Sequence, residues 1–489
     1  MTTLLEINHR REQRRRGEPL LQALELCLRR ARLLAAPPLL RLHVRLGVDL
    51  DPWQVQVPGL ATDSPSWLWA DGRSELCAAA WGVAAQRCLP VAERFAAARA
   101  YAAELLEQVV DVAEPGHEVD VDAPLAWAGL RYAAAPPGRR WAAWAGGTVG
   151  VPDVLIYRRR GTTYAVLALA VPAGGVPSAL AARLQARLQA LRAAACLAAE
   201  VPVPPAPGLP RAADEAAAAW QGRVAAAAAA MRAGQLDKVV LARSAQLHAP
   251  AGAEFDPVVT AWALRARHPT SVTYMLMGPD GSALVGASPE LLVQISGRSL
   301  FTQAVAGTTA RGRDAAEDAR LAAALLASAK DRAEHNIVVQ ALQAQLQPGC
   351  LELDMPATPG LLRLPRLQHL ETPFAATLRQ AGGILAWVAL LHPTPAVGGA
   401  PAGAAAAWLQ RHEPLDRGLY AGPVGWLTAA GDGAFAVAIR SVWLQGPAAV
   451  VYAGAGIVAV SSPAAEWRET EMKLDTACDG LRLRPLRRA

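Results

Sequence analysis

The stretch VTYMLMGPDGSALVGASPELLVQISG, Val272–Gly297, indicates the architecture of the chain. It reads as a strand, a PDG turn, a second strand, a short turn and a third strand, because apolar and β-branched runs alternate with turn-forming residues. The runs FAVAIRSVWLQ (435–445) and AAVVYAGAGIVAV (448–460) are predicted to be paired strands, and DKVVLARSAQLHA (237–249) another strand. Strands joined by short turns run antiparallel. With helices between them, the sequence predicts an α+β layered fold rather than a doubly wound parallel sheet.

Helices are predicted on both sides of a proline-dense segment. RDAAEDARLAAALLASAKDRAEHNIVVQALQAQL (313–346) has the period of one long amphipathic helix. Alanine-rich helices are expected at about 178–199 and 212–233, and between them VPVPPAPGLP (201–210) is typical of a stiff linker or surface loop. The part before it mixes a helical start with strand-like runs such as SWLWADG and DVLIYRRRGTTYAVLALAV, and offers little recognisable chemistry.

The bulk composition points to a folded protein in a reducing compartment. The 489 residues are 53% hydrophobic and 18% charged, which provides a substantial core and argues against disorder. The net charge of +6 is modest, and the basic runs RREQRRR (10–16) and RLRPLRRA (482–489) lack interleaved aromatic residues, so solvated tails are favoured over nucleic-acid binding. Six scattered cysteines form no CxxC pair, and no apolar signal segment is visible. A cytoplasmic location is therefore expected.

Two segments without Asp, Glu, Lys or Arg, 380–410 and 441–465, raise the question of a membrane span. A spanning helix needs about 20 predominantly apolar residues, usually without such punctuation. Prolines interrupt the first segment, and glycines and a proline interrupt the second. Both are therefore predicted to form buried strands and tight turns, and no membrane partner is expected. Peripheral attachment through the arginine-rich tail is a further hypothesis, which predicts liposome binding that is lost at high salt.

Two predicted helices each carry a pair of carboxylates on one face. In EWRETEMKL, Glu466, Glu469 and Lys473 fall at i, i+3 and i+7. In KDRAEH, Asp331 and Glu334 have the same spacing of three. A single acidic pair is more often a solvated helix face, but EWRETEMKL follows a run free of formal charge, which indicates entry from the interior. If the pairs face each other they require a divalent cation, and oxygen ligands without His or Cys favour Mg²⁺ and an anionic substrate.

Residues 234–483 resemble the chorismate-utilising enzymes, which include isochorismate synthases, salicylate synthases and the large subunits of anthranilate and aminodeoxychorismate synthases. The matching stretches cover about half of the chain in the family's order, which is far more specific than one motif. They are DKVVLAR, GASPELL, AVAGTTARG, AKDRAEH, LQHLETPF, LHPTPAVGG, EPLDRGLYAGPVGW, FAVAIR, YAGAGIV and AEWRETEMKL. The resemblance implies a layered α/β/β/α fold with large, mostly antiparallel sheets flanked by helices. Residues 1–210 would be a divergent N-terminal part of that fold, and residues 211–489 the chorismate-binding catalytic region.

The resemblance also implies a base and an acid. Converting chorismate to isochorismate adds water at C2 and expels the C4 hydroxyl, which needs one group of each kind. Lys238 matches the base of the water-using members; ammonia-using members typically carry glutamine there, so no glutaminase subunit is expected. A lysine base depends on burial or a neighbouring cation. Glu290 matches the general acid, which must be protonated beforehand, so an apolar setting should raise its pKa.

A Mg²⁺ site and a substrate pocket are implied in the same way. Glu334 and Glu469 match the direct Mg²⁺ ligands, and Asp331 and Glu466 match acids that hold the metal's waters or orient its ligands. An arginine can bind a substrate carboxylate bidentately, and glycines allow close approach of the ligand. The residues that match substrate-binding positions are Arg440, Lys473, Gly454, Gly456, Tyr420, Gly307, Thr308, His369 and Ala396.

The branch of the family depends on a small residue. Ala396 stands where lyase-capable members usually carry threonine, which favours isochorismate synthase over salicylate synthase, the branch that also eliminates pyruvate. Isochorismate feeds menaquinone or catechol siderophores, and the long N-terminal part favours the menaquinone type. A non-catalytic relative that only binds a small molecule is the remaining alternative, and the joint presence of the base, the acid, the metal ligands and the carboxylate binders argues against it. The expected partner is chorismate, and the protein is expected to be a monomer or homodimer.

Overall fold

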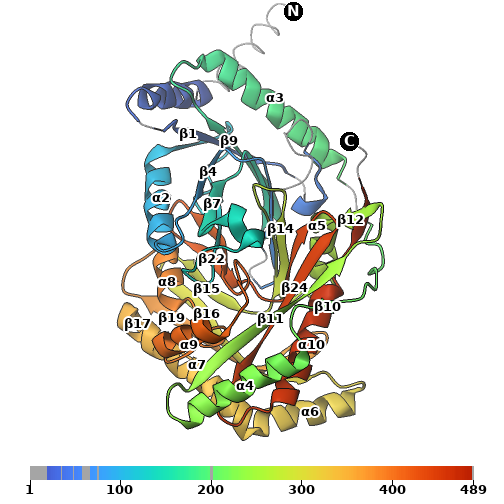
Figure 1. Cartoon of the computed structure of the whole chain (residues 1–489). Coiled ribbons are helices and arrows are strands. Elements are labelled where there is room, and N and C mark those ends of the chain that lie inside the picture. Colours follow the sequence, from blue (N-terminus) through green and yellow to red (C-terminus); the bar gives the residue numbers. More distant parts are fainter. Residues whose placement is uncertain are drawn as a thin grey trace, which may run out of the picture.

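The computed structural model describes residues 19–486 except 35, 48, 58–65, 74–75 and 199–201. The basic run at 10–16 and the last three residues of RLRPLRRA lie outside the described residues. Within the described part, the strands form two large sheets and a two-stranded sheet of β12 (Ala253–Phe255) and β25 (Leu483–Pro485) (Figure 1).

The two large sheets are mostly antiparallel; among the described pairings, β1 with β5 is the parallel one. In spatial order the first sheet consists of β10 (Ala212–Ala213), β11 (Lys238–His248), β24 (Ala448–Ile457), β23 (Ser441–Gln445), β14 (Ala283–Ser288), β13 (Val272–Met277), β2 (Trp67–Asp71), β3 (Leu76–Trp81), β8 (Val154–Arg159), β9 (Thr162–Ala170), β1 (Leu39–Arg45) and β5 (Val109–Ala113), with β20 (Gly399–Ala400) beside β11. The second consists of β17 (Cys350–Asp354), β19 (Leu367–Leu378), β16 (Ser299–Ala310), β15 (Leu291–Ser296), β22 (Gly433–Val437), β21 (Pro423–Thr428), β6 (Pro124–Leu130), β7 (Gly147–Val151) and β4 (Ala85–Cys88), with β18 (Gly360–Arg363) beside β19. The predicted α+β fold with antiparallel sheets is confirmed.

Helices cover the outer faces of both sheets (Figure 1). Besides a helical segment at 19–31, they are α2 (Arg94–Gln108), α3 (Pro177–Cys196), α4 (Ala217–Arg232), α5 (Pro257–Arg267), α6 (Ala315–Ala327), α7 (Ala329–Leu346), α8 (Ile384–Leu391), α9 (Ala402–His412) and α10 (Pro463–Cys478), with short 3-10 turns η1 (Pro52–Gln54), η2 (Arg139–Trp144) and η3 (Gln347–Gly349). Helices α3, α5 and α10 pack on the first sheet, and α7 and α8 on the second. The order helix, sheet, sheet, helix is the predicted layering.

Strand β2 shows how the layers arise from the sequence. Successive side chains of a strand point to opposite faces. Trp67 and Trp69 therefore join the core that includes Trp127 of the second sheet. Leu68 and Ala70 join the other core, with the apolar faces of α3, α5 and α10. Four of the five residues of β2 are thus apolar, as expected for a strand buried on both faces.

Each large sheet contains strands from both sides of residue 210. In the first sheet, β2 pairs with β13, which places Trp69 opposite Tyr274. In the second, β6 pairs with β21, which places Trp127 opposite Trp426. Residues 202–210 form no helix or strand. The N-terminal strands therefore extend the same sheets that the later strands begin.

The chain crosses from one sheet to the other at two places that the sequence did not reveal. The quoted stretch folds as β13, β14 and β15, but β14 lies in the first sheet and β15 in the second, so Pro289 and Glu290 form a crossing. FAVAIRSVWLQ was expected to be one strand, which is wrong: β22 and β23 lie in different sheets. Arg440, at φ +52°, lies in the crossing between them. The expected pairing of its second half with β24 is confirmed.

Two helix predictions need correction. The predicted helix at 313–346 is two helices, because Ser328 adopts an extended backbone and its side chain accepts a hydrogen bond from the Asp331 amide, which starts α7. The helix expected from 212 begins at Ala217, because residues 212–213 pair with β11 as β10.

The two segments without Asp, Glu, Lys or Arg fold differently from one another. Segment 380–410 contains α8 and α9 rather than the expected buried strands, whereas 441–465 forms the expected strands β23 and β24. Among the described helices, none is long and apolar enough to cross a membrane. All six cysteines lie within the described residues and are unpaired.

Candidate functional site

A cavity lies where the two crossings meet the inner faces of α7 and α10. Most of the predicted site residues line it. The lining consists of Val240, Pro289, Glu290, Val305, Ala306, Gly307, Thr308, Glu334, His369, Ala396, Ile439, Arg440, Gly454, Gly456, Glu469 and Lys473. Four predicted residues lie behind this lining: Lys238, Tyr420, Asp331 and Glu466. The residues come from widely separated parts of the chain, so the cavity is formed only by the complete fold.

Glu290 is held inside the protein by its position in the crossing between β14 and β15. Its backbone amide donates to Ser288 Oγ at 3.2 Å, and Thr394 Oγ1 donates to its Oε1 at 3.4 Å. Burial raises the pKa of Glu290 to about 7, although Lys238, Thr394, Lys473 and Arg440 oppose that shift. A carboxyl with this pKa is protonated in about half of the molecules at neutral pH. It can therefore donate a proton where an ordinary glutamate is already ionised.

Lys238 begins β11 and is completely buried. Its Nζ lies 3.0 Å from Glu334 Oε1, in an ion pair. Gly456 lies directly beside this pair: a Cβ there would be 2.1 Å from Glu334 Oε1 and 3.1 Å from Lys238 Cε. A side chain at this position would therefore displace the ion pair, so the glycine is required by close approach.

Arg440 is a buried cation without a carboxylate partner among the described residues. Its Nη2 lies 3.1 Å from His369 Nε2, and its Nη1 has no hydrogen-bond partner there. Burial lowers the pKa of Arg440 to about 10, so it remains charged at neutral pH. An unpaired buried guanidinium is costly, and an anionic ligand would offset that cost.

His369 is the neighbour that orients Arg440. Burial, and then Arg440 and Lys473, hold the pKa of His369 well below its usual range, so the ring is neutral. Its Nδ1 lies 3.0 Å from Thr308 Oγ1 and 3.3 Å from the Gly307 carbonyl oxygen. Gly307, at φ +76°, sits at the register shift between β16 and β19, a bulge that needs a residue tolerant of positive φ.

Each carboxylate of the two helices has a close partner. In α10, Glu469 pairs with Lys473 at 2.6 Å, and Lys473 also donates to the Gly454 carbonyl at 2.8 Å. Glu466, only 1% exposed, pairs with Lys330 of α7 at 2.7 Å. Of these contacts, the Lys330–Glu466 pair joins the two helices.

The carboxylates also influence one another. Burial raises the pKa of Glu466, and the Glu469 carboxylate raises it further. Burial likewise raises the pKa of Asp331, with Glu334 and Glu469 adding to the effect, while a hydrogen bond with Ser328 opposes it. Among the described residues, no three His, Cys, Asp or Glu side chains are arranged closely enough to hold a metal ion as they stand. The acids are thus close enough to repel, but lysines currently neutralise them.

Tyr420 lies outside the cavity wall, behind Gly454. A Cβ at Gly454 would be 3.2 Å from the Tyr420 hydroxyl, and the Tyr420 ring stacks on Tyr452 with centroids 5.0 Å apart. Ala396 lines the cavity from the loop that follows α8. Gly454 therefore lies between the Tyr420 hydroxyl and the cavity.

Sequence reasoning missed two side chains that act on the site, Lys330 and Thr394. Both lie inside the quoted motifs AKDRAEH and LHPTPAVGG, which is the signal that could have identified them. Glu471 of α10, which lies away from the cavity, pairs with Arg243 and, at 2.7 Å, with Arg211. Those contacts anchor α10 to the first sheet.

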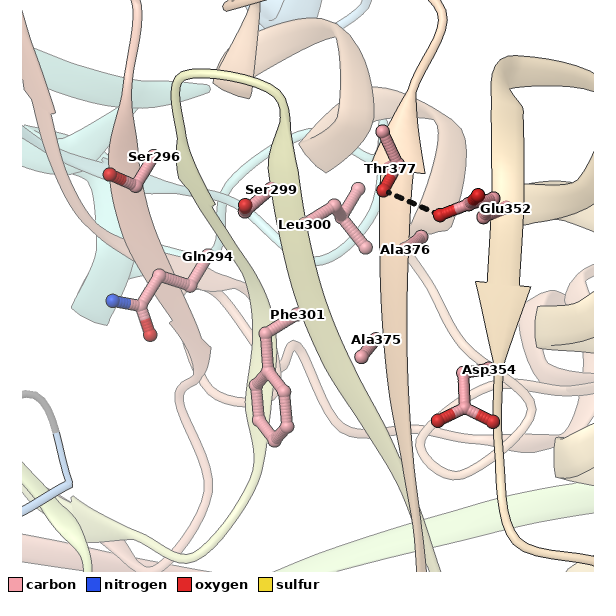
Figure 2. Close-up of a pocket in the computed structure, with 10 residues that line it drawn as sticks. All are labelled: Gln294, Ser296, Ser299, Leu300, Phe301, Glu352, Asp354, Ala375, Ala376 and Thr377. Carbon is pink, nitrogen blue, oxygen red and sulfur yellow. Dashed lines mark hydrogen bonds between the residues drawn. The ribbon is translucent and has the colours of Figure 1, made fainter.

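A larger hollow lies elsewhere, on β15, β16, β17 and β19 (Figure 2). Its two ionisable side chains, Glu352 and Asp354, are exposed, and Glu352 accepts from Thr377 Oγ1 at 3.4 Å. None of the predicted site residues lines it. Without a buried charged group it lacks what distinguishes the first cavity, so size does not identify the functional site here.

Comparisons of this chain with known proteins agree on one family. The family model described as chorismate binding enzyme matches residues 28–482. Over 262 residues the chain is 46% identical to the salicylate biosynthesis isochorismate synthase of Pseudomonas aeruginosa, which covers 54% of this chain and 54% of that protein. Over 257 residues it is 40% identical to the isochorismate synthase EntC of Escherichia coli, covering 53% of this chain and 65% of that protein. The chain thus matches about half to two thirds of the length of these relatives.

The fold as a whole also has a solved counterpart. The structure of MenF, the menaquinone-specific isochorismate synthase of Escherichia coli, superposes with a TM-score of 0.72 at 24% identity, covering 94% of this chain and 100% of that one. At this identity the likeness concerns the fold. It extends well beyond the roughly half of this chain that the two curated relatives match.

Proposed function

The chain belongs to the chorismate binding enzyme family, and we propose that within it this protein is an isochorismate synthase. The reaction would add water at C2 of chorismate and expel the C4 hydroxyl. One observation supports this most strongly: a buried glutamic acid with a pKa of about 7 shares a cavity with a buried arginine that has no carboxylate partner among the described residues. The first suits proton donation to a leaving hydroxyl, and the second suits an anionic substrate.

The proton transfers would be divided between two residues. Lys238, as the base, would take a proton from the water that attacks C2, for which its amine must first give up the proton that it holds in the ion pair with Glu334. Glu290, as the acid, would give its proton to the C4 hydroxyl, which leaves as water. One water enters and one leaves, so the net reaction is an isomerisation. Both groups are buried, which keeps bulk solvent from competing with the bound water.

Substrate binding would rest on the cations and on exposed backbone. Arg440 and Lys473 line the cavity and would hold a chorismate carboxylate, with His369 keeping the guanidinium in place. Gly454 and Gly456 line the same wall, and at Gly456 the missing side chain makes room for the Glu334 carboxylate. Gly307, Thr308 and Ala396 would complete the walls, with Tyr420 behind Gly454.

The side chains also fit Mg²⁺ in their chemistry, because the four acids of α7 and α10 offer only oxygen donors. Glu334 and Glu469, which line the cavity, would hold the ion, with Asp331 and Glu466 supporting them. When bound, the ion would bind a substrate carboxylate and stabilise negative charge near the leaving hydroxyl. Lys238 and Lys473 share those two carboxylates, so metal binding would compete with two ion pairs.

A titration with Mn²⁺, followed by electron paramagnetic resonance, tests this site without turnover. Glu334→Gln and Glu469→Gln should each weaken binding at least tenfold, and Lys238→Ala should strengthen it, because a competing cation is removed. Glu352→Gln, in the exposed hollow of Figure 2, is the matched control. Binding that is indifferent to both site variants would remove the metal from the proposal.

The activity itself is tested with purified protein, chorismate and Mg²⁺, with products identified by NMR. Isochorismate alone is the expected product. Salicylate with pyruvate would move the protein to the lyase branch. No turnover with metal, and none when ammonium is added, would refute the enzymatic proposal.

We assign the product to menaquinone synthesis. The likeness to the menaquinone-specific enzyme extends over 94% of this chain, including the N-terminal strands, and supports this assignment. The Pseudomonas relative is instead named for salicylate biosynthesis. Deleting the gene should abolish menaquinone; loss of an excreted iron chelator with normal menaquinone would contradict the assignment.

A further inference from the structure

Strand β11, which begins with Lys238, has a gap along one edge. Its other edge pairs with β24 from Val239 to His248. On the gapped edge, β20 pairs with residues 238–239 and β10 with residues 245–246. Between these two short strands, no described strand pairs with residues 240–244. Backbone groups in such a gap need other partners.

A buried ion pair between Arg417 and Glu413 supplies them. Arg417 Nη2 donates to the Val240 carbonyl at 2.6 Å, and the Ala242 amide donates to Glu413 Oε2 at 2.7 Å. The two side chains also bond each other twice, at 2.6 Å and 2.8 Å. They are only 3% and 5% exposed. Two side chains therefore do here what the backbone of a neighbouring strand does elsewhere.

The same guanidinium holds the loop that follows α8. Its Nη1 donates to the Val397 carbonyl at 2.8 Å, and its plane lies over the ring of Tyr132 at 4.3 Å. The Tyr132 hydroxyl donates to the same carbonyl at 3.3 Å. This loop contains Ala396, which lines the cavity, and Thr394, which donates to Glu290.

We propose that Arg417 and Glu413 are positioning residues for the reaction. They fix the strand that carries the base against the loop that contacts the acid, and so set the relative placement of Lys238, Glu290 and the wall at Ala396. The proposal rests on the proposed function. Neither side chain lines the cavity, so neither is expected to touch substrate.

A role in stability alone explains the pair poorly. Replacing a buried ion pair by apolar residues of similar volume is often neutral or stabilising, because two charges no longer need to be desolvated. What apolar residues could not reproduce are the bonds to Val240, Ala242 and Val397, which join the two segments. Those bonds depend on the several N–H donors of the planar guanidinium, an arrangement that lysine lacks.

The test uses two variants and a matched control. Arg417→Lys keeps the positive charge but removes the planar guanidinium. The double variant Arg417→Met with Glu413→Leu removes both charges, so that no buried charge is left unpaired. It serves as the test if the first variant folds poorly. The control is Arg223→Lys, in the ion pair that Arg223 of α4 forms with Glu215; these side chains are 14% and 15% exposed, and neither lines the cavity. Calorimetry with chorismate counts the binding-competent sites, and kcat is expressed per competent site.

Both test variants should still bind chorismate through Arg440 and Lys473, with a Kd within about threefold of wild type, while kcat per competent site falls at least tenfold. The alkaline limb of the kcat profile should move to higher pH, because Lys238 and Thr394 would stabilise the Glu290 carboxylate less well. The control should change neither. If kcat per competent site and the pH profile of kcat were unchanged in both test variants, the Arg417–Glu413 pair would have a structural role only.

Amide hydrogen exchange separates this proposal from the proposed function. In both test variants, exchange at the amides of Val240, Val397 and Gly398 should accelerate at least tenfold relative to the rest of the first sheet, because Val240 donates to the Gly398 carbonyl and the other two amides donate to the Thr394 carbonyl inside the clamped region. If wild-type protein does not turn over chorismate, the proposed function fails. The clamp is then judged by exchange alone, and uniform exchange in both variants would overturn it.

Discussion

The two halves of each large sheet bury charge in different ways. In the N-terminal half, two buried arginines each have a carboxylate partner: Arg41 pairs with Asp111 at 3.4 Å, and Arg131 pairs with Asp416. In the later half, Glu290 receives one long hydrogen bond, and one nitrogen of Arg440 has none within the described residues. The first arrangement places a carboxylate beside each of these cations, whereas the second leaves Arg440 without a carboxylate among the described residues, which suits an anionic ligand.

The N-terminal and later halves also differ in the size of their buried residues. Most of the largest fully buried side chains of the N-terminal half are tryptophans, among them Trp67, Trp69 and Trp127. Around the cavity, glycines such as Gly307, Gly454 and Gly456 instead allow neighbouring groups to approach closely. The N-terminal strands thus provide stability to sheets whose later strands carry the chemistry. The experiments below are expected to separate those contributions.

The largest effect is expected for Glu290→Gln. It removes the proton donor but keeps the shape, so kcat should fall by about 10³-fold or more, equivalent to about 4 kcal/mol, while the Kd for chorismate changes little. Rapid-quench assays and calorimetry measure the two quantities. Lys238→Ala should behave in the same way, and loss of binding in both variants would show that the roles are assigned wrongly. Glu352→Gln should leave both quantities unchanged.

Trp127→Ala should have a comparable effect on stability instead. Trp127 is 2% exposed and packs against Gly150, where a Cβ would be 2.7 Å from its ring. Truncation should lower the free energy of unfolding by about 3 kcal/mol, measured with urea. Molecules that remain folded should keep their KM for chorismate. A changed KM would mean that the N-terminal half shapes the site directly.

Gly456→Ala should come next. The added methyl group would meet Glu334 Oε1 and Lys238 Cε, so kcat should fall by about 100-fold, near 2.7 kcal/mol, with little change in thermal stability. Gly222→Ala in α4 is the matched control, because a Cβ there meets nothing within 4 Å. Equal activity of the two variants would contradict the placement of Glu334 beside this glycine.

The smallest effect concerns pH. Because Glu290 must be protonated, kcat should fall as the pH rises through about 7. Thr394→Val removes a hydrogen bond that lowers the pKa of Glu290, so this limb should move upward by a few tenths of a pH unit. The same linkage acts on folding: the folded state binds this proton more tightly, so the stability it contributes at low pH is lost between about 4.5 and 7. Thr377→Val, in the exposed hollow, should leave the limb in place.

Local pattern was sufficient for much of the fold. Alternating and β-branched runs located β11, β13 and β24, and helical spacing placed Glu466 and Glu469 on one face of α10. It could not reveal that the chain changes sheets at Glu290 and Arg440, because a strand has the same local pattern whichever sheet it joins. Nor could it reveal the break at Ser328, since the apolar period continues through the cap.

Long-range pairing was beyond the sequence for a similar reason. Lys330 and Glu466 are neighbours through the packing of two helices, and the residues between them say nothing of that contact. The clamp of Arg417 on Val240 and Val397 likewise depends on a gap left by two short strands. The roles of Lys238, Glu290 and the carboxylates come from family resemblance, and they stay predictions until the variants are measured.

The continuity of the two sheets across residue 210 has a practical consequence. The halves meet only as β2 with β13 and as β6 with β21 within the two large sheets, and residues 202–210 connect them without forming a helix or strand. Cutting the chain there would leave two complementary pieces, each with two bare strand edges prone to aggregate alone. Expressed together they should reassemble, which makes this scaffold a candidate split reporter whose signal is chorismate turnover.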